Sequence, residues 1–230
     1  MVCMVLIAHA AFGEEKQSLA TQKEKMSYAA GLEIGDNLKK KSIDVDPEIL
    51  LKGIKDALSG GKPLMTEQEL KEVVQLMQKD LQEKKKILGE KNRKDGDSFL
   101  AENKKKQGVK TLPSGLQYKV VTEGAGGYPT ATDRVKVNYR GKLIDGTEFD
   151  SSYKRGEPAI FPTNGVIKGL TEALQLMKQG STWQLFIPSE LAYGDQGTPD
   201  GRIGPNAALI FEVELILVNP LTRKSKHAAD

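Results

Sequence analysis

The amino-acid sequence predicts an α+β protein. An all-helical N-terminal domain continues into a long spacer helix, and an antiparallel β-sheet wrapped around one short helix follows. Up to about Gln107 the apolar residues recur every three or four positions, which is the spacing of one helix face. From Leu112 onward they alternate with polar residues, which is the spacing of a strand with one buried face. One helical stretch interrupts these strands, and a helix covering an antiparallel sheet is the α+β arrangement.

The first residues differ from the rest of the chain. Residues 1–13 are apolar but too few to span a bilayer, and Ala8-His9-Ala10 fits the cleavage site of a secretory signal peptide. A positive segment before them is missing, which leaves a start further upstream open, and a lipoprotein anchored through Cys3 is the weaker alternative. We therefore expect export to the periplasm, the cell envelope or the medium, with the signal peptide removed and outer-membrane association left open.

Removal of the signal peptide would also remove most of the residues used in metal and nucleophilic sites. Cys3 and His9 would be lost, which leaves His227, in the basic tail 220–230, as the remaining histidine. Disulfides and Cys/His zinc sites are then excluded, and a histidine-dependent nucleophile would need His227 to fold back. The net charge of +3, with lysine runs set among acids, favours solvated helix faces over nucleic-acid binding. We expect neither a metal nor a cofactor.

Residues 14–83 are predicted to form a helical N-terminal domain. In its first helix, apolar or small residues recur every four positions at Met26, Ala30, Ile34 and Leu38. In the second, Asp46-Pro47 is an N-cap followed by proline at the first helical position, and Gly60 ends the helix. The expected buried face of this second helix consists of Leu50, Ile54, Ala57 and Leu58.

The third helix begins at a capping box. The hydroxyl of Thr66 and the carboxylate of Glu69 can each accept a hydrogen bond from the other's backbone N–H. An apolar stripe follows, made of Leu70, Val73, Val74, Met77 and Leu81. Three helices of this size are too few for a rich core of their own. We therefore expect a homodimer formed through the N-terminal helices.

The segment 84–111 is too highly charged to be buried in a monomer core. Two interpretations remain open: a solvated spacer helix, or a helix frayed around Asp95-Gly96-Asp97.

Residues 112–219 carry the period of two. The expected strands contain Leu116 to Val120, Val135 to Tyr139, Trp183 to Ile187 and Leu209 to Leu217. A helix is predicted from Ile167 to Met177, with Gly180 ending it. Asp145-Gly146 is typical of a hairpin turn. Trp183 shares a face with Leu185 and Ile187, which indicates a core position.

The stretch GTEFDSS, residues 146–152, places the carboxylate of Asp150 directly after the phenyl ring of Phe149. It is either a turn that carries an acid or the wall of an apolar pocket that contains one fixed polar group. A carboxylate hydrolase that pairs Asp150 with Glu148 or Asp145 is a poor alternative, because all three acids lie in one hairpin.

The second half closely resembles the FKBP-type peptidyl-prolyl cis-trans isomerases. Four stretches match in order: VKVNYRGKLIDGTEFDSS, GEPAIFP, GVIKGLTEALQLMKQGSTWQLFIPSELAYG and IGPNAALIFEVELI. The first half resembles the helical domain of the Mip-like secreted members, which dimerise through it. The stretch FLAENKKKQGVKTLPSGLQYKVV at the junction is typical of that subgroup.

The resemblance implies an isomerase that binds X-Pro in an apolar pocket and stabilises the twisted amide. It implies that Asp150 hydrogen-bonds Tyr139 near the twisting carbonyl, and that the Ile167 N–H and the Tyr193 hydroxyl hold substrate carbonyls. At two positions the chain departs from the family, with Leu170 in place of the floor tryptophan and Ala159 in place of an aromatic residue. The implied substrate-binding residues are Tyr139, Phe149, Phe161, Val166, Leu170, Ile203 and Phe211.

The resemblance also indicates partners. Substrates would be proline-containing unfolded or nascent exported polypeptides, and a macrolide of the FK506 kind is an implied ligand, its affinity affected by Leu170 and Ala159. The alternative is a dimeric chaperone without enzymatic activity that holds unfolded clients between its domains. Leu170 is the residue that favours this alternative, because a less aromatic pocket suits holding better than catalysis.

Overall fold

The structure is a computed structural model that describes residues 18–41 and 43–220. The expected signal peptide, residues 1–13, and all of the basic tail after Pro220 lie outside these ranges. The chain divides into two compact units, Met1–Asp44 and Val45–Asp230. In the part of the chain that the structure describes, no helix combines the length and apolar character needed to cross a membrane. The division at residues 83, 111 and 219 stays a prediction.

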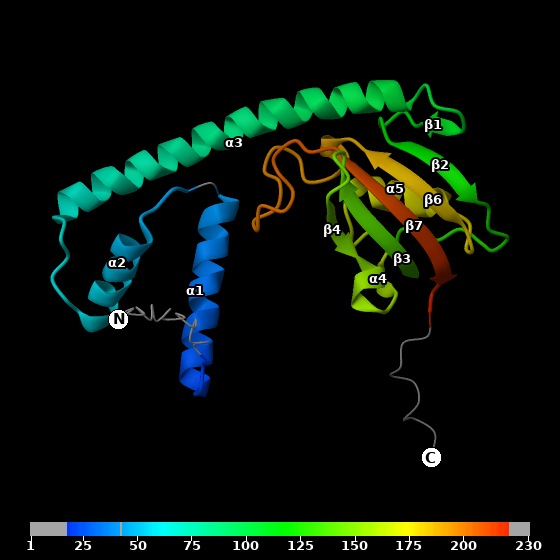
Figure 1. Ribbon diagram of the computed structural model, residues 1–230. Coiled ribbons are helices and arrows are strands. Elements are labelled where there is room, and N and C mark those ends of the chain that lie inside the picture. Colours follow the sequence, from blue (N-terminus) through cyan, green and yellow to red (C-terminus); the bar gives the residue numbers. More distant parts are fainter. Residues whose placement is uncertain (1–17, 42, 221–230) are drawn as a thin grey trace, which may run out of the picture. The chain divides into compact units, whose positions relative to one another are not determined.

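The first unit contains α1, Gln22–Lys40 (Figure 1). Its N-cap is Thr21, whose side chain accepts from the Glu24 N–H while the Glu24 carboxylate accepts from the Thr21 N–H. This capping box satisfies backbone donors that would otherwise lack a partner at the helix start. All residues of α1 are described and none is buried; Met26 has 64% of its surface exposed.

The second unit begins with α2, Pro47–Ser59, whose boundaries match the sequence prediction. The Asp46 side chain accepts from the N–H groups of Glu48 and Ile49, and Gly60 ends the helix in the left-handed conformation. The predicted buried face is wrong for the single chain. Leu58 is 85% exposed, and no residue of this fully described helix is buried.

A single helix, α3, runs from Glu67 to Asn103. The predicted capping box is confirmed, with Thr66 as N-cap and Glu69 at the third helical position. The helix does not fray at Asp95-Gly96-Asp97. Gly96 is buried there, and a Cβ on it would lie 3.1 Å from that of Ala208, so the glycine allows close packing against the chain before the last strand.

The sheet domain, residues 109–218, is a seven-stranded antiparallel sheet in the order β1-β2-β6-β7-β3-β4, with β5 paired to β3 (Figure 1). The four predicted strands are present as β2, β3, β6 and β7. The elements are β1 Val109–Thr111, β2 Gln117–Thr122, β3 Arg134–Leu143, β4 Glu148–Ser151, α4 Ser152–Arg155, β5 Ala159–Pro162, α5 Lys168–Leu176, β6 Thr182–Ile187, η1 Ser189–Leu191 and β7 Leu209–Val218.

The core lies between the inner face of the sheet and α5. Gly169 lets the helix approach β6 closely, since a Cβ there would meet the Ile187 side chain at 2.5 Å. Trp183 is a core residue as predicted and stacks on Tyr118, with ring centroids 4.3 Å apart. The predicted turn at Asp145-Gly146 is also confirmed, with Gly146 at a positive φ of 90°. The buried core residues include Leu116, Val135, Val137, Ala173, Leu174, Met177, Leu185, Leu209, Val213 and Leu215.

The last strand corrects one prediction. Leu217 was expected on the inner face but is 40% exposed. Leu215 pairs with Val137 while Leu217 pairs with Lys136, so β7 has one extra residue at this point. Such a bulge reverses the alternation of faces, and Val218 packs against the core instead.

The outer face of the sheet is covered locally by the C-terminal part of α3. Phe186 is buried there, and its ring lies 6.0 Å from that of Phe99. Gln117, the pairing neighbour of Phe186, accepts from Asn103 at 3.0 Å and donates to the Leu100 carbonyl at 2.9 Å. A buried amide pair and an aromatic contact therefore fix the end of α3 to the sheet domain.

Candidate functional site

A pocket of about 460 Å³ opens in the sheet domain between the sheet, the start of α5 and the chain after η1. It gathers nearly all of the residues that the sequence singled out: Tyr139, Phe149, Asp150, Phe161, Val166, Ile167, Leu170, Tyr193 and Phe211. Ile203 lies elsewhere. It is only 3% exposed and belongs to the hydrophobic core.

The aromatic wall of the pocket depends on a glycine in β3. Gly141 pairs with Asp150 on one side and Phe211 on the other. A Cβ at Gly141 would come within 2.7 Å of the Phe149 ring and 2.9 Å of the Phe211 ring. The two rings meet edge to face over this position, with centroids 5.6 Å apart. The glycine therefore allows both rings to pack against the strand.

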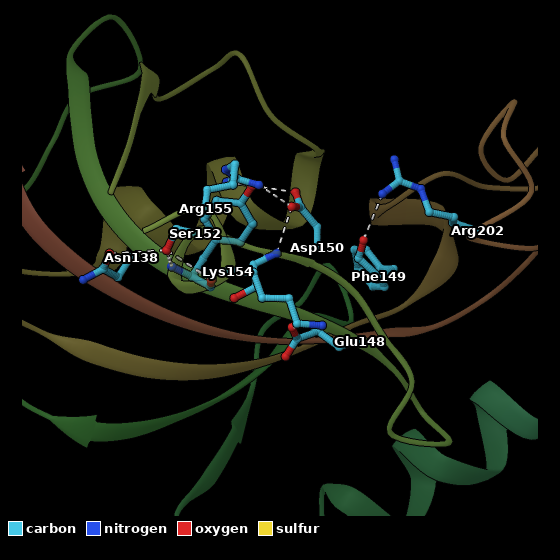
Figure 2. A network of polar contacts seen from close by, with 10 residues as sticks. Asn138, Glu148, Phe149, Asp150, Ser152, Lys154, Arg155 and Arg202 are labelled. Atoms are coloured by element: carbon cyan, nitrogen blue, oxygen red, sulfur yellow. Dashed lines mark hydrogen bonds and ion pairs between the residues drawn. The ribbon is translucent and has the colours of Figure 1, made fainter. Parts of the chain in front are cut away.

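Asp150 is the polar centre of the pocket. It accepts from the Tyr139 hydroxyl at 2.5 Å, a bond that the sequence analysis predicted. Arg155 reaches the same pair, with Nη1 on the Asp150 carboxylate at 2.5 Å and Nη2 on the Tyr139 hydroxyl at 2.7 Å. Figure 2 shows Arg155 and Asp150 joined in this network. The three side chains hold one another in a fixed geometry at the rim of an apolar cavity.

The network keeps the carboxylate ionised. Partial burial alone would raise the pKa of Asp150, but the hydrogen bonds from Tyr139 and Arg155 and the charge of Arg155 hold it below the usual value. For Tyr139, burial and the bond to Asp150 raise the pKa of the hydroxyl above its usual value. At neutral pH the pair is therefore a carboxylate and a neutral phenol that donates to it.

Two hydrogen-bond donors on pocket-lining residues have no partner among the residues that the structure describes. Ile167 is the N-cap residue of α5, and none of residues 18–41 and 43–220 accepts a bond from its N–H. The Tyr193 hydroxyl likewise donates to none of the described residues, and 40% of the Tyr193 surface is exposed. Burial, followed by the nearby charges of Asp150 and Asp200, raises the pKa of Tyr193, so its hydroxyl is protonated at neutral pH.

Hydrogen bonds through Thr163 hold the start of α5 in place. Thr163 is fully buried and its N–H donates to the Asp133 carbonyl at 2.8 Å. Its own carbonyl accepts from the Thr171 hydroxyl at 3.0 Å. Leu170, in the first turn of the helix, lines the pocket at the position where the family resemblance implies a tryptophan. Ala159, on β5, pairs with Val137 and packs against the core.

The sequence analysis missed several residues of the site. Arg155 lies at the end of the one-turn helix α4, where no periodicity marks it. Arg202 donates to the Phe149 carbonyl at 3.1 Å and so joins the loop after Tyr193 to β4 (Figure 2). The remaining lining residues that were not predicted are Val137, Gly165, Leu174 and Val213. Their alternation or helical spacing indicated only core positions, because pocket and core share the same apolar pattern.

The other acidic residues near Asp150 in sequence form contacts of their own. Glu148 pairs with Arg140 at 3.1 Å and with Lys154 at 3.0 Å. Asp145 accepts from the Thr147 N–H within the hairpin turn. Of the described residues that line the pocket, Asp150 alone is acidic, so a two-carboxylate hydrolase has no second group here. Among the described residues, no group of three or more His, Cys, Asp or Glu side chains is placed to hold a metal.

Comparison with known proteins gives matches along most of the chain. The family model for the domain amino-terminal to FKBP-type peptidyl-prolyl isomerase matches residues 23–120. The model for FKBP-type peptidyl-prolyl cis-trans isomerase matches residues 126–216.

Individual relatives match both regions together. The outer membrane protein MIP of Legionella longbeachae is 48% identical over 205 residues, which is 87% of this chain and 88% of that protein. The peptidyl-prolyl cis-trans isomerase Mip of Coxiella burnetii is 48% identical over 204 residues, with the same coverage. The crystal structure of FkpA from Escherichia coli is similar with a TM-score of 0.63 at 38% identity, covering 88% of this chain and 99% of that one.

Proposed function

The chain belongs to the FKBP-type peptidyl-prolyl cis-trans isomerases, and from this premise we propose that the pocket around Asp150 is where it binds X-Pro and lowers the barrier to rotation. Its activity is peptidyl-prolyl cis-trans isomerisation. The family match therefore favours an isomerase over a chaperone without enzymatic activity.

The reaction needs neither a nucleophile nor a metal ion. Rotation about an X-Pro bond passes a barrier of about 18–20 kcal/mol. At the top of that barrier the amide has lost its resonance, so the twisted state is less polar than the planar one. The apolar wall of Phe149, Phe161 and Phe211 favours the less polar state relative to water and holds the prolyl ring.

The observation that carries the proposal is the pair of unpartnered donors, the Ile167 N–H and the Tyr193 hydroxyl, on residues that line an otherwise apolar pocket. Such donors are free to bind carbonyls of the substrate backbone on either side of the proline. Asp150, held by Tyr139 and Arg155, lies near the twisting carbonyl and orders its surroundings. Substrate is thereby fixed at both ends while the bond between them rotates.

The test is the cis-to-trans relaxation of short X-Pro peptides, with several residues before the proline because Leu170 and Ala159 bear on that preference. Asp150→Leu should lower kcat/KM about 5- to 100-fold, since it removes the acceptor of the Tyr139 hydroxyl and the counter-charge of Arg155. Tyr193→Phe should lower it about 3- to 10-fold through one lost hydrogen bond.

A matched control is Tyr128→Phe, because Tyr128 is exposed and lies near Lys178 rather than in the pocket. It should keep wild-type kinetics. Wild-type rates in both pocket variants, with each shown to be folded, would move the working site away from this pocket.

The assembly proposed for the chain is a homodimer through its N-terminal helices. The supporting observation is that large apolar side chains of these helices are exposed in the single chain. Burying them against a second copy would gain about 25 cal/mol per Å² of apolar surface. A monomeric mass in light scattering at micromolar concentration would contradict the dimer. The exposed side chains include Met26, Tyr28, Leu32, Ile49, Leu58, Leu70, Val73 and Leu76.

The remaining expectations concern location and partners. A similar protein from Legionella longbeachae is named an outer membrane protein, which supports a place in the cell envelope for this chain. The clients proposed are proline-containing polypeptides that are exported and not yet folded. A macrolide of the FK506 kind is proposed to compete for the same pocket, with Leu170 reducing the aromatic contact. Holding of clients by the dimer would accompany isomerisation rather than replace it.

A further inference from the structure

The loop that carries Tyr193, residues 188–208, connects β6 to β7 and is closed at its base. The Gly194 N–H donates to the Ser189 carbonyl at 2.9 Å, and the Gly194 carbonyl accepts from the Asn206 N–H at 2.7 Å. Asn206 has a φ of 54°, in the left-handed region that asparagine tolerates better than most residues. The backbone N–H of Asn206 therefore fixes the carbonyl of Gly194, the residue that follows Tyr193.

The side chain of Asn206 is held in turn by α3. Its Oδ1 accepts from Arg93 Nη2 at 2.9 Å, and its Nδ2 donates to the Gly89 carbonyl at 3.4 Å. Next to it, Asn92 donates to the Pro205 carbonyl at 2.8 Å. Arg93 also pairs with Glu190 at 3.1 Å, at the other end of the loop. Both ends of the loop thus contact the same turn of α3.

The contact is close as well as polar. A Cβ on Gly89 would lie 3.1 Å from the Asn206 side chain, and one on Gly204 would lie 2.9 Å from the Asn92 side chain. Two glycines, one on the helix and one on the loop, therefore allow the surfaces to meet without a gap. Because the two surfaces are closely packed, a shift of α3 would move the loop with it.

We propose that α3 is a positioning element of the isomerase site: through Arg93 and Asn206 it fixes the backbone at Gly194 and thereby the Tyr193 hydroxyl. Arg93 and Asn206 do not touch substrate and act through Tyr193. The inference rests on the proposed role of Tyr193 as a donor to substrate. It assigns to the long helix a part in catalysis, in addition to joining two regions of the chain.

Asn206→Gly tests the proposal, because glycine keeps the left-handed backbone and removes the side-chain bridge to α3. In the full chain, KM for a short X-Pro peptide should rise about 3- to 10-fold while kcat changes little, as expected when a binding contact loosens. Asn206→Asp keeps an oxygen for Arg93 and should return KM close to wild type. Lys91→Ala is the control, since Lys91 pairs with Asp95 on the same helix and forms no hydrogen bond or ion pair with the described residues of the loop.

A double-variant cycle distinguishes positioning from a general loss of stability. In a Tyr193→Phe background, Asn206→Gly should raise KM by less than about two-fold, because the hydroxyl through which it acts is absent. The proposal is overturned if Asn206→Gly has wild-type KM, if it raises KM by the same factor in both backgrounds, or if Asn206→Asp restores nothing. A Tyr193→Phe variant with wild-type KM would contradict the proposed role of Tyr193 itself, and the inference would fall with it.

Discussion

The sheet domain and the N-terminal helices α1 and α2 use apolar residues in opposite ways. Leu116, Leu185 and Leu215 in the sheet domain have no exposed surface, whereas α1 and α2, both wholly described, contain no buried residue. The sheet domain therefore completes its core within one chain, whereas the helices expose the apolar side chains through which we propose that two copies pair. Helix α3 has both characters, with Leu76 exposed near its start and Gly89 and Gly96 packed on the sheet domain.

The largest effect should come from matched leucine truncations in the two regions. Leu185→Ala removes a fully buried side chain and should cost about 2–5 kcal/mol of the free energy of unfolding. Leu58→Ala removes one that is exposed in the single chain and should cost less than about 0.5 kcal/mol in a dilute, monomeric sample. Urea denaturation monitored by Trp183 fluorescence measures the first, and helical circular dichroism the second. If both substitutions lowered the free energy of unfolding of the dilute monomer equally, the two regions would not differ in how they bury apolar side chains.

Self-association should depend on the helix residues and not on the core of the sheet domain. Leu58→Glu and Met26→Glu place a charge on faces proposed to be buried between copies. Each should raise the dimer dissociation constant by at least about 10-fold, since burying one large apolar side chain contributes about 1.5–3 kcal/mol. Sedimentation equilibrium provides the measurement. Leu185→Ala serves as comparison, and a dimer unaffected by either glutamate would place the interface elsewhere.

Substitutions of one glycine in α2 and one in α3 should have smaller and opposite effects on stability. Gly53 in α2 has open space where a Cβ would lie, whereas Gly96 in α3 faces Ala208. Gly96→Leu should destabilise the sheet domain by about 1–3 kcal/mol through overpacking. Gly53→Ala should stabilise its helix by about 0.5–1 kcal/mol through propensity alone. Thermal unfolding followed by circular dichroism separates the two, and a stabilising Gly96→Leu would argue against the packing of α3.

The smallest expected effect is the loss of stabilisation by Asp200 at acidic pH. Hydrogen bonds from Thr198 and Arg202 lower the pKa of Asp200 from 3.8 to about 2. Because the folded-state pKa is depressed, the ionised form stabilises the loop above pH 3.8, and this stabilisation is lost as the pH falls toward about 2. The Asp200 side chain is 41% exposed, so solvent screens the interaction. Carbon NMR titration should show the shift in wild type and its reduction in Arg202→Ala; an unchanged pKa in the variant would rule out Arg202 as a cause.

Local rules predicted much of the fold. The caps at Asp46 and Thr66 and the turn at Gly146 depend on a few neighbouring residues, so the sequence indicates them directly. Alternation predicted the long strands, and it failed at Leu217 because a bulge depends on the partner strand, which local pattern does not contain.

The site was harder to predict than the strands. Family resemblance identified most of the pocket residues and the bond between Tyr139 and Asp150. Arg155 was missed because its contact depends on how one turn of helix follows β4. The docking of α3 was missed because Gly89, Gly96 and Asn103, which make the contact, give no hydrophobic signal. Close approach there depends on small size and amide pairing, which periodicity does not report.

The contrast between the two regions is tested by comparing one variant from each in the same assay with a short X-Pro peptide: Asp150→Leu in the pocket and Leu58→Glu on α2. Asp150→Leu should lose about 5- to 100-fold in kcat/KM and keep the mass of the wild type. Leu58→Glu should keep kcat/KM within about two-fold while its mass falls to that of a monomer. Wild-type kcat/KM in Asp150→Leu, or a loss of activity in the Leu58→Glu monomer, would contradict a self-contained catalytic pocket in the sheet domain.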